Sequence, residues 1–251
     1  MNDILVALAV GGRALFTRRM LGLVLWPLIG ACAAWGLAAG LFWGDWVGLA
    51  QRLVESPQLA GFVGSGVLAF VGSALAWLLV LPLYLLAVLA TALAVTAIFG
   101  MPAMVRDIAQ RYYPQLERAR GGTAAGSVGN VALTLIAYLL LMLVSLPFWF
   151  IVPFGGVALP LLINGWLNAR LFRYDALAEH ASPAEYRVLK RQARAGLFAL
   201  GCAVAALQVL MSYTLVLLPV VLLFLPVYSG LVFVYYSLGR LQRLRAAPTS
   251  A

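Results

Sequence analysis

The chain has 251 residues, of which 64% are hydrophobic and 10% are charged, with a mean hydropathy of +1.00 and a formal net charge of +9. A soluble domain carries about 25% charged residues, so this composition excludes a soluble globular protein. Apolar runs longer than about 18 residues recur along the chain, which predicts an all-α, polytopic integral membrane protein built from transmembrane helices.

The basic residues are grouped rather than scattered. Sixteen of the seventeen lie in four clusters, Arg13–Arg19, Arg106–Arg120, Arg170–Arg194 and Arg240–Arg245. If the clusters share the cytoplasmic face, that face carries 16 positive and 6 negative charges and the opposite face 1 and 2, as the positive-inside rule expects. We therefore expect cytoplasmic N- and C-termini and anionic lipid as the partner of the basic face. Nucleic-acid-binding signatures are absent, so no nucleic-acid partner is expected.

We interpret residues 1–251 as a single membrane domain that begins with an interfacial helix in segment 1–19. The apolar run Asn2–Thr17 is too short to span a bilayer and is interrupted by Gly11, Gly12 and Arg13, so it should lie on the cytoplasmic leaflet. Its arginines follow the apolar run instead of preceding it, which is unlike a cleaved signal peptide.

Residues 20–120 are predicted to form two long helices with a cytoplasmic projection. The first span should run from about Met20 to Trp43, followed by an outer segment from about Gly44 to Gly66. In that segment, Ser56-Pro57 has the chemistry that opens a helix. Four glycines share one face of the first helix and favour close packing against another helix: Gly36, Gly40, Gly44 and Gly48.

The second span is predicted within Val67–Phe99, which contains no charged residue. As a helix this stretch measures about 50 Å against a bilayer core of about 30 Å, so it should tilt, kink at Pro82 or project from the membrane. Four apolar residues then recur every fourth position and indicate an amphipathic continuation: Met104, Ile108, Tyr112 and Leu116. Gly121–Gly129 is predicted to be a flexible linker.

Two long uncharged stretches follow, Val131–Ala169 and Ala195–Gly239, each bordered by basic clusters at both ends. Basic residues prefer the cytoplasmic side, so each stretch should enter and leave the membrane on that side. Each contains two prolines seven residues apart: Pro153 and Pro160 in the first, Pro219 and Pro226 in the second. The pattern predicts two proline-turned helical hairpins, in residues 131–172 and 195–245, the second ending in a basic tail.

The length of the first hairpin favours a turn inside the membrane. Its 39 residues give about 58 Å of helix, no more than two complete crossings and a turn would need. The apex, with Gly155 and Gly156, carries no charge. We therefore expect the first hairpin to penetrate the membrane only part of the way, with its freed backbone groups shielded by protein. The second stretch has 45 residues and is long enough to cross fully, but its apex is equally apolar, so we expect partial penetration there too.

Residues 173–194 should form a basic cytoplasmic connector between the hairpins. Ser182-Pro183-Ala184-Glu185 is a capping box with proline at the first helical position, which predicts a helix from Pro183 to about Arg194. Its basic surface either faces lipid and solvent or contacts a solute or partner. His180, the only histidine, is expected to be exposed beside Glu179.

No catalytic or metal site is predicted, and neither an enzyme activity nor a cofactor is expected. Every acidic residue maps to a polar segment, and the motifs of intramembrane enzymes are absent. Cys32 and Cys202 lie inside apolar spans and are interpreted as packing residues. The polar residues inside the apolar stretches are neutral, Asn164 and Asn168 among them. Each serves either helix-to-helix hydrogen bonding or substrate contact.

The order of these elements resembles the CysZ-type sulfate permeases and the wider etoposide-induced protein 2.4 family. The residues that carry the resemblance are Pro153 with Gly155–Gly156, Trp166 with Ala169, the connector RYDALAEHASPAEYRVLKRQARAGLFALG, and the apex around Pro219–Pro226. The resemblance implies two long helices and two half-penetrating hairpins, assembled as a homo-oligomer in the bacterial inner (plasma) membrane. The chain has Tyr174-Asp175-Ala176 where the family has Asp-Tyr-Pro, and Thr17-Arg18-Arg19 in place of the family's Gly-x-Arg anion motif.

The same resemblance implies transport of a small solute such as a sulfate-like oxyanion. Arg18 and Arg19, at the entrance to the first span, either offer charge and free backbone N–H groups to an anion or anchor the helix at the cytoplasmic face. With Asn164 and Asn168 they are the candidate substrate-binding residues. The alternative function is a non-transporting membrane scaffold or regulator that binds lipid or a partner protein through its basic face.

Overall fold

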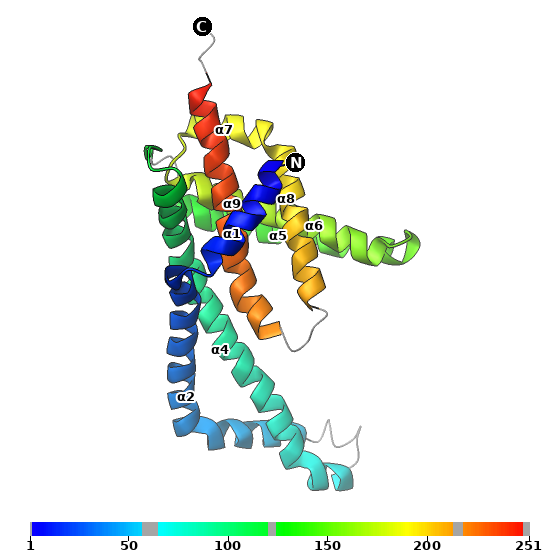
Figure 1. Cartoon of the computed structure of the whole chain (residues 1–251). Helices are drawn as coiled ribbons and strands as arrows, with labels where there is room; N and C mark the ends of the chain where they lie inside the picture. The colour runs from blue at the N-terminus through cyan, green and yellow to red at the C-terminus, as the bar shows by residue number, and fades with distance from the viewer. Residues whose placement is uncertain (1, 57–64, 120–123, 213–217, 248–251) are drawn as a thin grey trace. The chain divides into compact units, whose positions relative to one another are not determined.

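The computed structural model describes residues 2–56, 65–119, 124–212 and 218–247. All regular structure in these residues is α-helical (Figure 1), which confirms the predicted all-α class. The helices are α1 (Asn2–Leu15), α2 (Arg18–Val54), α4 (Ser65–Tyr112), α5 (Ala124–Ile151), α6 (Gly155–Ala178), α7 (Pro183–Gln192), α8 (Arg194–Ser212) and α9 (Leu218–Ala246).

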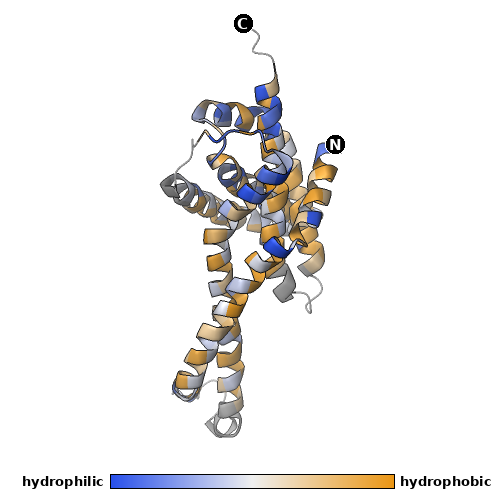
Figure 2. Ribbon diagram, turned by 60° about the vertical axis from the view of Figure 1, so that its left-hand side comes forward, coloured by the Kyte–Doolittle hydropathy of each residue, from blue (hydrophilic) through white to orange (hydrophobic). Residues whose placement is uncertain are grey.

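Among the described residues, four helices contain stretches long and apolar enough to cross a membrane. The stretches are Arg18–Val54 of α2, Ala74–Thr96 of α4, Gly129–Ile151 of α5 and Arg194–Met211 of α8. Many of their large apolar side chains are exposed, and Figure 2 shows the long helices to be predominantly hydrophobic. Lipid or another protein must cover such a surface, which supports a multi-pass membrane protein.

The chain forms two compact units, which are described separately. The smaller unit is Leu23–Thr96, and the larger combines Met1–Gly22 with Ala97–Ala251. Helices α2 and α4 each begin in one unit and end in the other. The smaller unit is therefore an insertion between two parts of the larger one.

In the smaller unit, α2 continues past Trp43, where the sequence predicted the end of the first span, and stops only at Val54. Its last turns pack against α4, and the ring centroids of Trp43 and Trp77 lie 5.1 Å apart. The buried members of this cluster are Ala50, Ala76 and Val80, with Trp43, Trp46 and Val47 packed against them. This apolar packing keeps the beginning of the predicted outer segment helical.

The glycine face of α2 is open in the described chain. A methyl group on Gly36, Gly40, Gly44 or Gly48 would meet no described atom within 4 Å, so no helix in the described residues packs closely on this face, contrary to the prediction. The helix start predicted at Ser56-Pro57 lies outside the described residues from Pro57 onward.

The core of the larger unit lies where α1, α6, α8 and α9 meet. Its buried members are Ala7, Ala169, Ala193, Leu197, Leu200, Val204, Val232, Phe233 and Tyr236. Glycine permits the close approach of α1 to α9, because a Cβ on Gly11 would collide with Val232. The other face of α1 leaves Leu5 and Val6 exposed, so α1 has the amphipathic character predicted for an interfacial helix.

Helices α5 and α6 form the first hairpin, and the chain turns at residues 152–154 as predicted. Phe154 has a φ of 59°, in the left-handed region. The next position requires glycine, because a Cβ on Gly155 would collide with the carbonyl oxygen of Phe148. A Cβ on Gly156 would lie 3.7 Å from its nearest neighbour, the carbonyl oxygen of Trp149, so the turn requires glycine at the first position only.

Helix α5 begins at Ala124, and the predicted linker Gly121–Gly129 is therefore wrong from Ala124 onward. Near the start of α5, Ser127 Oγ donates a hydrogen bond of 2.5 Å to Asp175 of α6. Packing of this segment on α6 overrides the weak helix propensity of its glycines.

Helices α8 and α9 form a second packed pair, and residues 213–217 between them lie outside the described part of the chain. The apex predicted around Pro219–Pro226 is wrong, because α9 already begins at Leu218 and contains Pro226 in its interior. Pro219 occupies the first turn of α9, where a missing N–H costs little. Pro160 lies inside α6 in the same way as Pro226 lies inside α9.

The connector helix α7 begins with the predicted capping box. Ser182 Oγ accepts from the Glu185 N–H at 3.2 Å, and Glu185 Oε2 accepts from the Ser182 N–H at 2.8 Å. The helix predicted to reach Arg194 ends at Gln192, and α8 begins two residues later at Arg194.

The last part of α4 belongs to the larger unit and is amphipathic, with Met104 and Ile108 buried as predicted. Tyr112 does not follow this pattern and is 40% exposed, whereas Tyr113 is buried. Helix α4 ends at Tyr112, and Tyr113 just beyond it donates a 3.0 Å hydrogen bond to the carbonyl oxygen of Tyr235 on α9.

Candidate functional site

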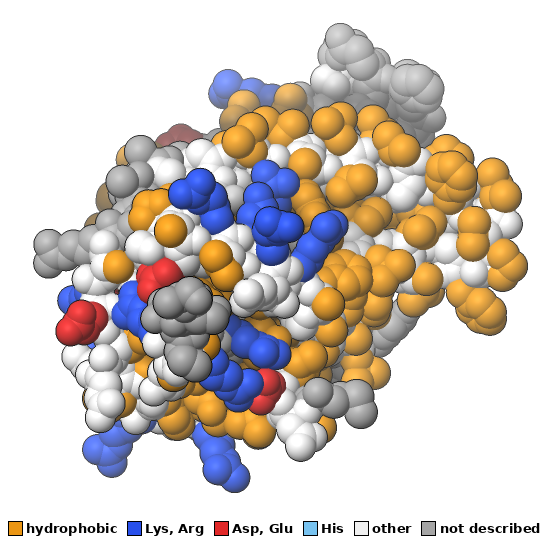
Figure 3. Space-filling model, turned by 90° about the horizontal axis from the view of Figure 1, so that it is seen from above, with side chains coloured by type: hydrophobic (Ala, Val, Ile, Leu, Met, Phe, Trp, Pro, Cys, Tyr) orange, Lys and Arg blue, Asp and Glu red, His pale blue; other side chains and the backbone are white. Residues whose placement is uncertain are grey.

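Lysine and arginine side chains gather on one face of the larger unit, near the C-terminal part of α9 (Figure 3). The exposed basic residues of α7, α8 and α9 include Arg187, Lys190, Arg191, Arg194 and Arg243. The arginines differ in their ion-pair and hydrogen-bond partners, and these partners determine which guanidinium groups remain available to a ligand.

Arg18 and Arg19 lie in the first turn of α2. Arg19 Nη1 is 3.3 Å from Oδ1 of Asp107 on α4, and Arg111 Nε is 3.0 Å from the other carboxylate oxygen. Asp107 is 2% exposed, so Arg19 ties the start of α2 to a buried carboxylate. Arg18 is exposed, and no ion pair joins it to a residue that the structure describes. Of these two candidates, only Arg18 has a guanidinium free for an anion.

Asn164 and Asn168 lie on α6 and contribute to a seam of neutral polar residues between α5 and α6. Asn164 is satisfied locally, because its Nδ2 donates to the Pro160 carbonyl oxygen at 2.8 Å and its Oδ1 accepts from Tyr138 at 3.5 Å. Asn168 and Thr134 are both buried. Neither Asn168 Nδ2 nor Thr134 Oγ1 has a hydrogen-bond partner within the described ranges. Asn168 is therefore the candidate of this pair with unused hydrogen-bonding capacity.

Arg245, in the last turn of α9, joins two residues of the connector to the segment that follows α4. Its Nε and Nη2 donate to the Glu185 carboxylate at 2.7 and 3.1 Å. The carbonyl oxygens of Glu117 and His180 accept from its Nη1 and Nη2 at 3.0 and 2.7 Å. The hydrogen bond from Arg245, which is the largest effect, lowers the pKa of Glu185 to about 2, so the carboxylate stays ionised at physiological pH.

The prediction that His180 is exposed is wrong. His180 is 1% exposed and lies in the turn after α6, where its backbone carbonyl oxygen accepts a hydrogen bond from Arg245. Burial lowers the pKa of the imidazole. The histidine is thus a neutral packing residue within the connector region.

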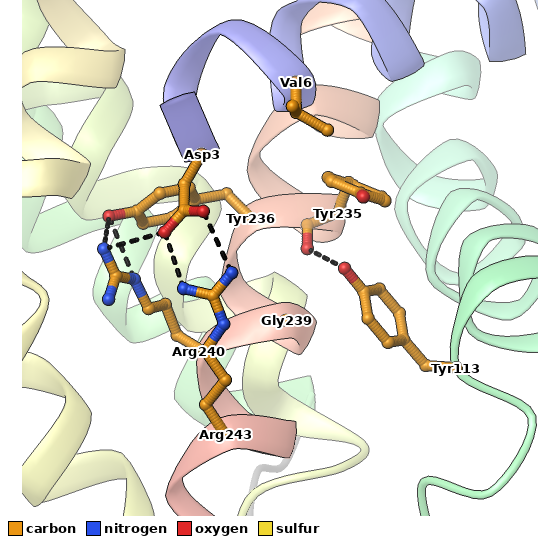
Figure 4. A pocket seen from close by; sticks show the side chains of 8 residues that line it. All are labelled: Asp3, Val6, Tyr113, Tyr235, Tyr236, Gly239, Arg240 and Arg243. Atoms are coloured by element: carbon orange, nitrogen blue, oxygen red, sulfur yellow. Dashed lines mark hydrogen bonds and ion pairs between the residues drawn. The ribbon is translucent and has the colours of Figure 1, made fainter. Parts of the chain in front are cut away.

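A cavity of about 220 Å³ lies between α1, the end of α4 and α9, and sequence reasoning missed it (Figure 4). We call it the α9 pocket. The residues that line it are Asp3, Val6, Tyr113, Tyr235, Tyr236, Gly239, Arg240 and Arg243. The only sequence signal was the pair of arginines three positions apart at the end of an apolar stretch, since Asp3 is 240 residues away from Arg243.

Tyr113 and Gly239 shape one wall of the α9 pocket. A Cβ on Gly239 would lie 2.8 Å from the Tyr113 hydroxyl, so glycine is needed for this phenol to reach α9. Burial raises the pKa of Tyr113, and the hydroxyl remains a neutral donor to the Tyr235 carbonyl oxygen.

Together, these features define a multi-pass α-helical membrane protein with a basic face and no cluster of three or more possible metal ligands in the residues described. The sequence matches the family described as sulfate transporter CysZ/etoposide-induced protein 2.4 over residues 7–234. The chain belongs to this family, which confirms the resemblance drawn from its motifs. Comparison with curated proteins and with solved structures found no match. Of the residues that line the α9 pocket, only Tyr113 lies inside the matched range.

Proposed function

We propose that this protein conducts a small oxyanion, sulfate being the first candidate, across the bacterial inner membrane down its gradient. Membership of a family described by sulfate transport, over nearly the whole chain, carries this proposal. The basic face and the four apolar stretches of spanning length support it.

The chemistry of the candidate residues supports weak, stepwise contact with an anion. Arg18 offers an exposed guanidinium at the start of α2, where the unpaired backbone N–H groups of a helix also favour an anion. Thr134 and Asn168 offer neutral hydrogen-bond donors inside the α5–α6 seam. An anion that is conducted must bind each site strongly enough to enter it and weakly enough to leave it. A single charged group at the entrance, followed by neutral hydrogen-bond donors inside, meets this requirement.

Replacing Arg18 with alanine should lower sulfate flux into proteoliposomes about fivefold, equivalent to about 1 kcal/mol of lost anion stabilisation. Radiolabelled sulfate uptake measures this effect. The matched control is Arg191→Ala, which removes an exposed arginine from α7 and should leave flux unchanged. Arg19 is a poorer test because its removal leaves buried Asp107 with Arg111 alone. Flux equal to that of empty vesicles would refute the transport proposal, and wild-type flux for Arg18→Ala would remove Arg18 from it.

We also propose that the α5–α6 hairpin penetrates the membrane only part of the way. Asn130 of α5 donates to the Arg170 carbonyl oxygen of α6, which sets the polar base of the hairpin. In the α6 arm, the 16 residues from Gly155 to Arg170 give about 24 Å of helix, less than the bilayer core of about 30 Å, so this arm limits the depth of the hairpin although the α5 arm alone reaches spanning length. The exposed apolar apex, with Phe150 at 90% and Phe154 at 87%, supports an end within lipid or against a second copy.

A cysteine at Gly156 should resist a membrane-impermeant maleimide added from the outer side. The experiment uses a background in which Cys32 and Cys202 are alanine. A cysteine at Ser56, in the predicted outer segment, serves as the outside control, and one at Lys190 serves as the inside control. Labelling of the Gly156 position as fast as the Ser56 position would show a complete crossing and overturn partial penetration.

The alternative is a non-transporting scaffold or regulator, and the basic face favours it because such a surface attracts anionic lipid or an acidic partner. The two functions differ in a simple way, since a scaffold retains a stoichiometric companion after gentle extraction and supports no flux. We further propose a homo-oligomer, because the open glycine face of α2 allows a helix of a second copy to approach closely.

A further inference from the structure

Two guanidinium groups share one carboxylate in the α9 pocket (Figure 4). Arg243 forms a two-pronged pair with Asp3, with Nη1 and Nη2 at 2.6 and 2.9 Å from the two carboxylate oxygens. Arg240 Nη2 lies 3.4 Å from Oδ2 of the same residue. The arginines are three residues apart on one helix, so they face the same side. The cluster therefore keeps one uncompensated positive charge.

Hydrogen-bond donors also remain in excess. Each guanidinium carries five N–H donors, and Asp3 supplies only two acceptor oxygens. Arg240 turns its Nε and Nη2 toward the Tyr236 hydroxyl at 3.2 and 3.0 Å. Because the Tyr236 oxygen accepts these bonds, its own hydrogen is directed away from Arg240. A ligand at this point would meet two guanidinium groups, while Tyr236, which is 4% exposed, holds Arg240 in place as an acceptor.

The arginines are accessible from outside the cluster. The Arg240 side chain is 39% exposed and that of Arg243 is 62% exposed. They line the α9 pocket on one side and, on the other, a second cavity of about 230 Å³ with Leu189, Gln192 and Leu244. An anion can therefore approach both guanidinium groups while Gly11 still packs on Val232 and holds α1 to α9.

We propose that Arg240 and Arg243 form a binding site for a tetrahedral oxyanion group, with Tyr236 positioning Arg240, and that Asp3 occupies this site as an internal competitor when no ligand is bound. Guanidinium forks match phosphate and sulfate oxygens as well as they match a carboxylate. Exposed ion pairs contribute little stability, so such a ligand can displace Asp3. The site is separate from the transport proposal and stands without it.

Two sources supply this chemistry: the phosphate of an anionic lipid headgroup and a free oxyanion. The surroundings fit a lipid, because Leu5 and Val6 of α1 are exposed apolar residues close to Asp3 in sequence, and Val6 lines the pocket. They would lie along acyl chains while the headgroup phosphate reaches Arg240 and Arg243. The experiment includes one probe for each source.

The test is calorimetric titration of the purified full-length protein in neutral detergent with dioctanoyl phosphatidylglycerol and, separately, with sodium sulfate. Asp3→Asn should bind at least one probe about fivefold more tightly than wild type, because the competing charge is gone. The double variant Arg240→Ala/Arg243→Ala should bind it at least about tenfold more weakly. Binding of the lipid alone identifies a headgroup site, and binding of sulfate, with or without the lipid, identifies a site open to free oxyanions.

The matched control is Lys190→Ala/Arg191→Ala, which removes the same charge from exposed positions of α7 and should keep wild-type affinity. If the double arginine variant fails to fold, Arg240→Lys/Arg243→Lys replaces it; this variant keeps the charge, loses the fork geometry and should bind more weakly than wild type. Equal affinity of wild type and Asp3→Asn for both probes, or equal loss in the α7 control, would overturn the proposal.

Discussion

Replacing Arg245 with alanine should lower the free energy of unfolding by about 3 kcal/mol, because several charge-assisted hydrogen bonds are lost together. Arg245 alone joins the Glu185 carboxylate to the carbonyl oxygens of Glu117 and His180. Its removal also leaves Glu185, whose side chain is only 24% exposed, without its cationic partner. The connector between α6 and α8 should then detach from α9.

Thermal unfolding in detergent and limited trypsin digestion measure this loss. Trypsin should cut the Arg245→Ala variant faster at Arg187 and Lys190, which lie on α7. Arg245→Lys should be intermediate, since a lysine keeps the charge but not the fork that reaches several acceptors. The control is Arg191→Ala, an exposed change on the same connector, which should melt like wild type. A melting temperature and digestion pattern unchanged in Arg245→Ala would show that the connector is held by other contacts.

The second large effect is expected at Gly201, where α8 crosses α6. A Cβ on Gly201 would collide with the backbone carbonyl oxygen of Gly165, and a Cβ on Gly165 would collide with Cys202. Backbone cannot move aside as a flexible side chain can, so Gly201→Ala should destabilise the larger unit by about 2–3 kcal/mol. Yield of monodisperse protein and its melting temperature report the change.

Gly30→Ala is the matched control, because it makes the same chemical change inside α2, away from the proposed oligomer face, where no described atom lies within 4 Å. Alanine favours a helix over glycine by about 0.5–1 kcal/mol, so this variant should be as stable as wild type or slightly more stable. If both alanine variants behave alike, the close crossing of α6 and α8 is not needed for the fold.

Local chemistry explains which parts of the fold were predictable. The capping box of Ser182 and Glu185 is formed by residues three apart, and the structure has both of its hydrogen bonds. The first hairpin turn at residues 152–154 was also predictable, because Pro153 and Gly155 disfavour a continuous helix there. Each of these signals acts over a few residues and needs no knowledge of distant partners.

The errors arise where a distant contact decides the outcome. Residues from Ala124 to Gly129 are helical because α6 packs beside them, and His180 is buried in a turn whose backbone is bonded to Arg245, 65 residues later. Pro226 stays inside α9 instead of ending it, since neighbouring groups can satisfy the carbonyl that proline frees in a membrane helix.

The candidate site shows the same limit. Arg18 and Arg19 are adjacent and look equivalent in the sequence, but Asp107 selects Arg19 as its partner and leaves Arg18 unpaired. The α9 pocket was not predicted at all, because it needs Asp3 from the first helix and Arg243 from the last. An ion pair between residues this far apart in the sequence leaves no local pattern from which it could be predicted.

The contact of α1 with α9 also has a consequence for biosynthesis. Helix α1 is translated more than 200 residues before Val232 and Arg243 of α9, which contact Gly11 and Asp3. During this interval α1 has no partner in α9, and its exposed apolar side chains Leu5 and Val6 would hold it on the lipid surface. The larger unit can therefore close only after α9 has been synthesised, and a nascent chain that stalls before α9 exposes an unpaired α1 to the quality-control machinery of the cell.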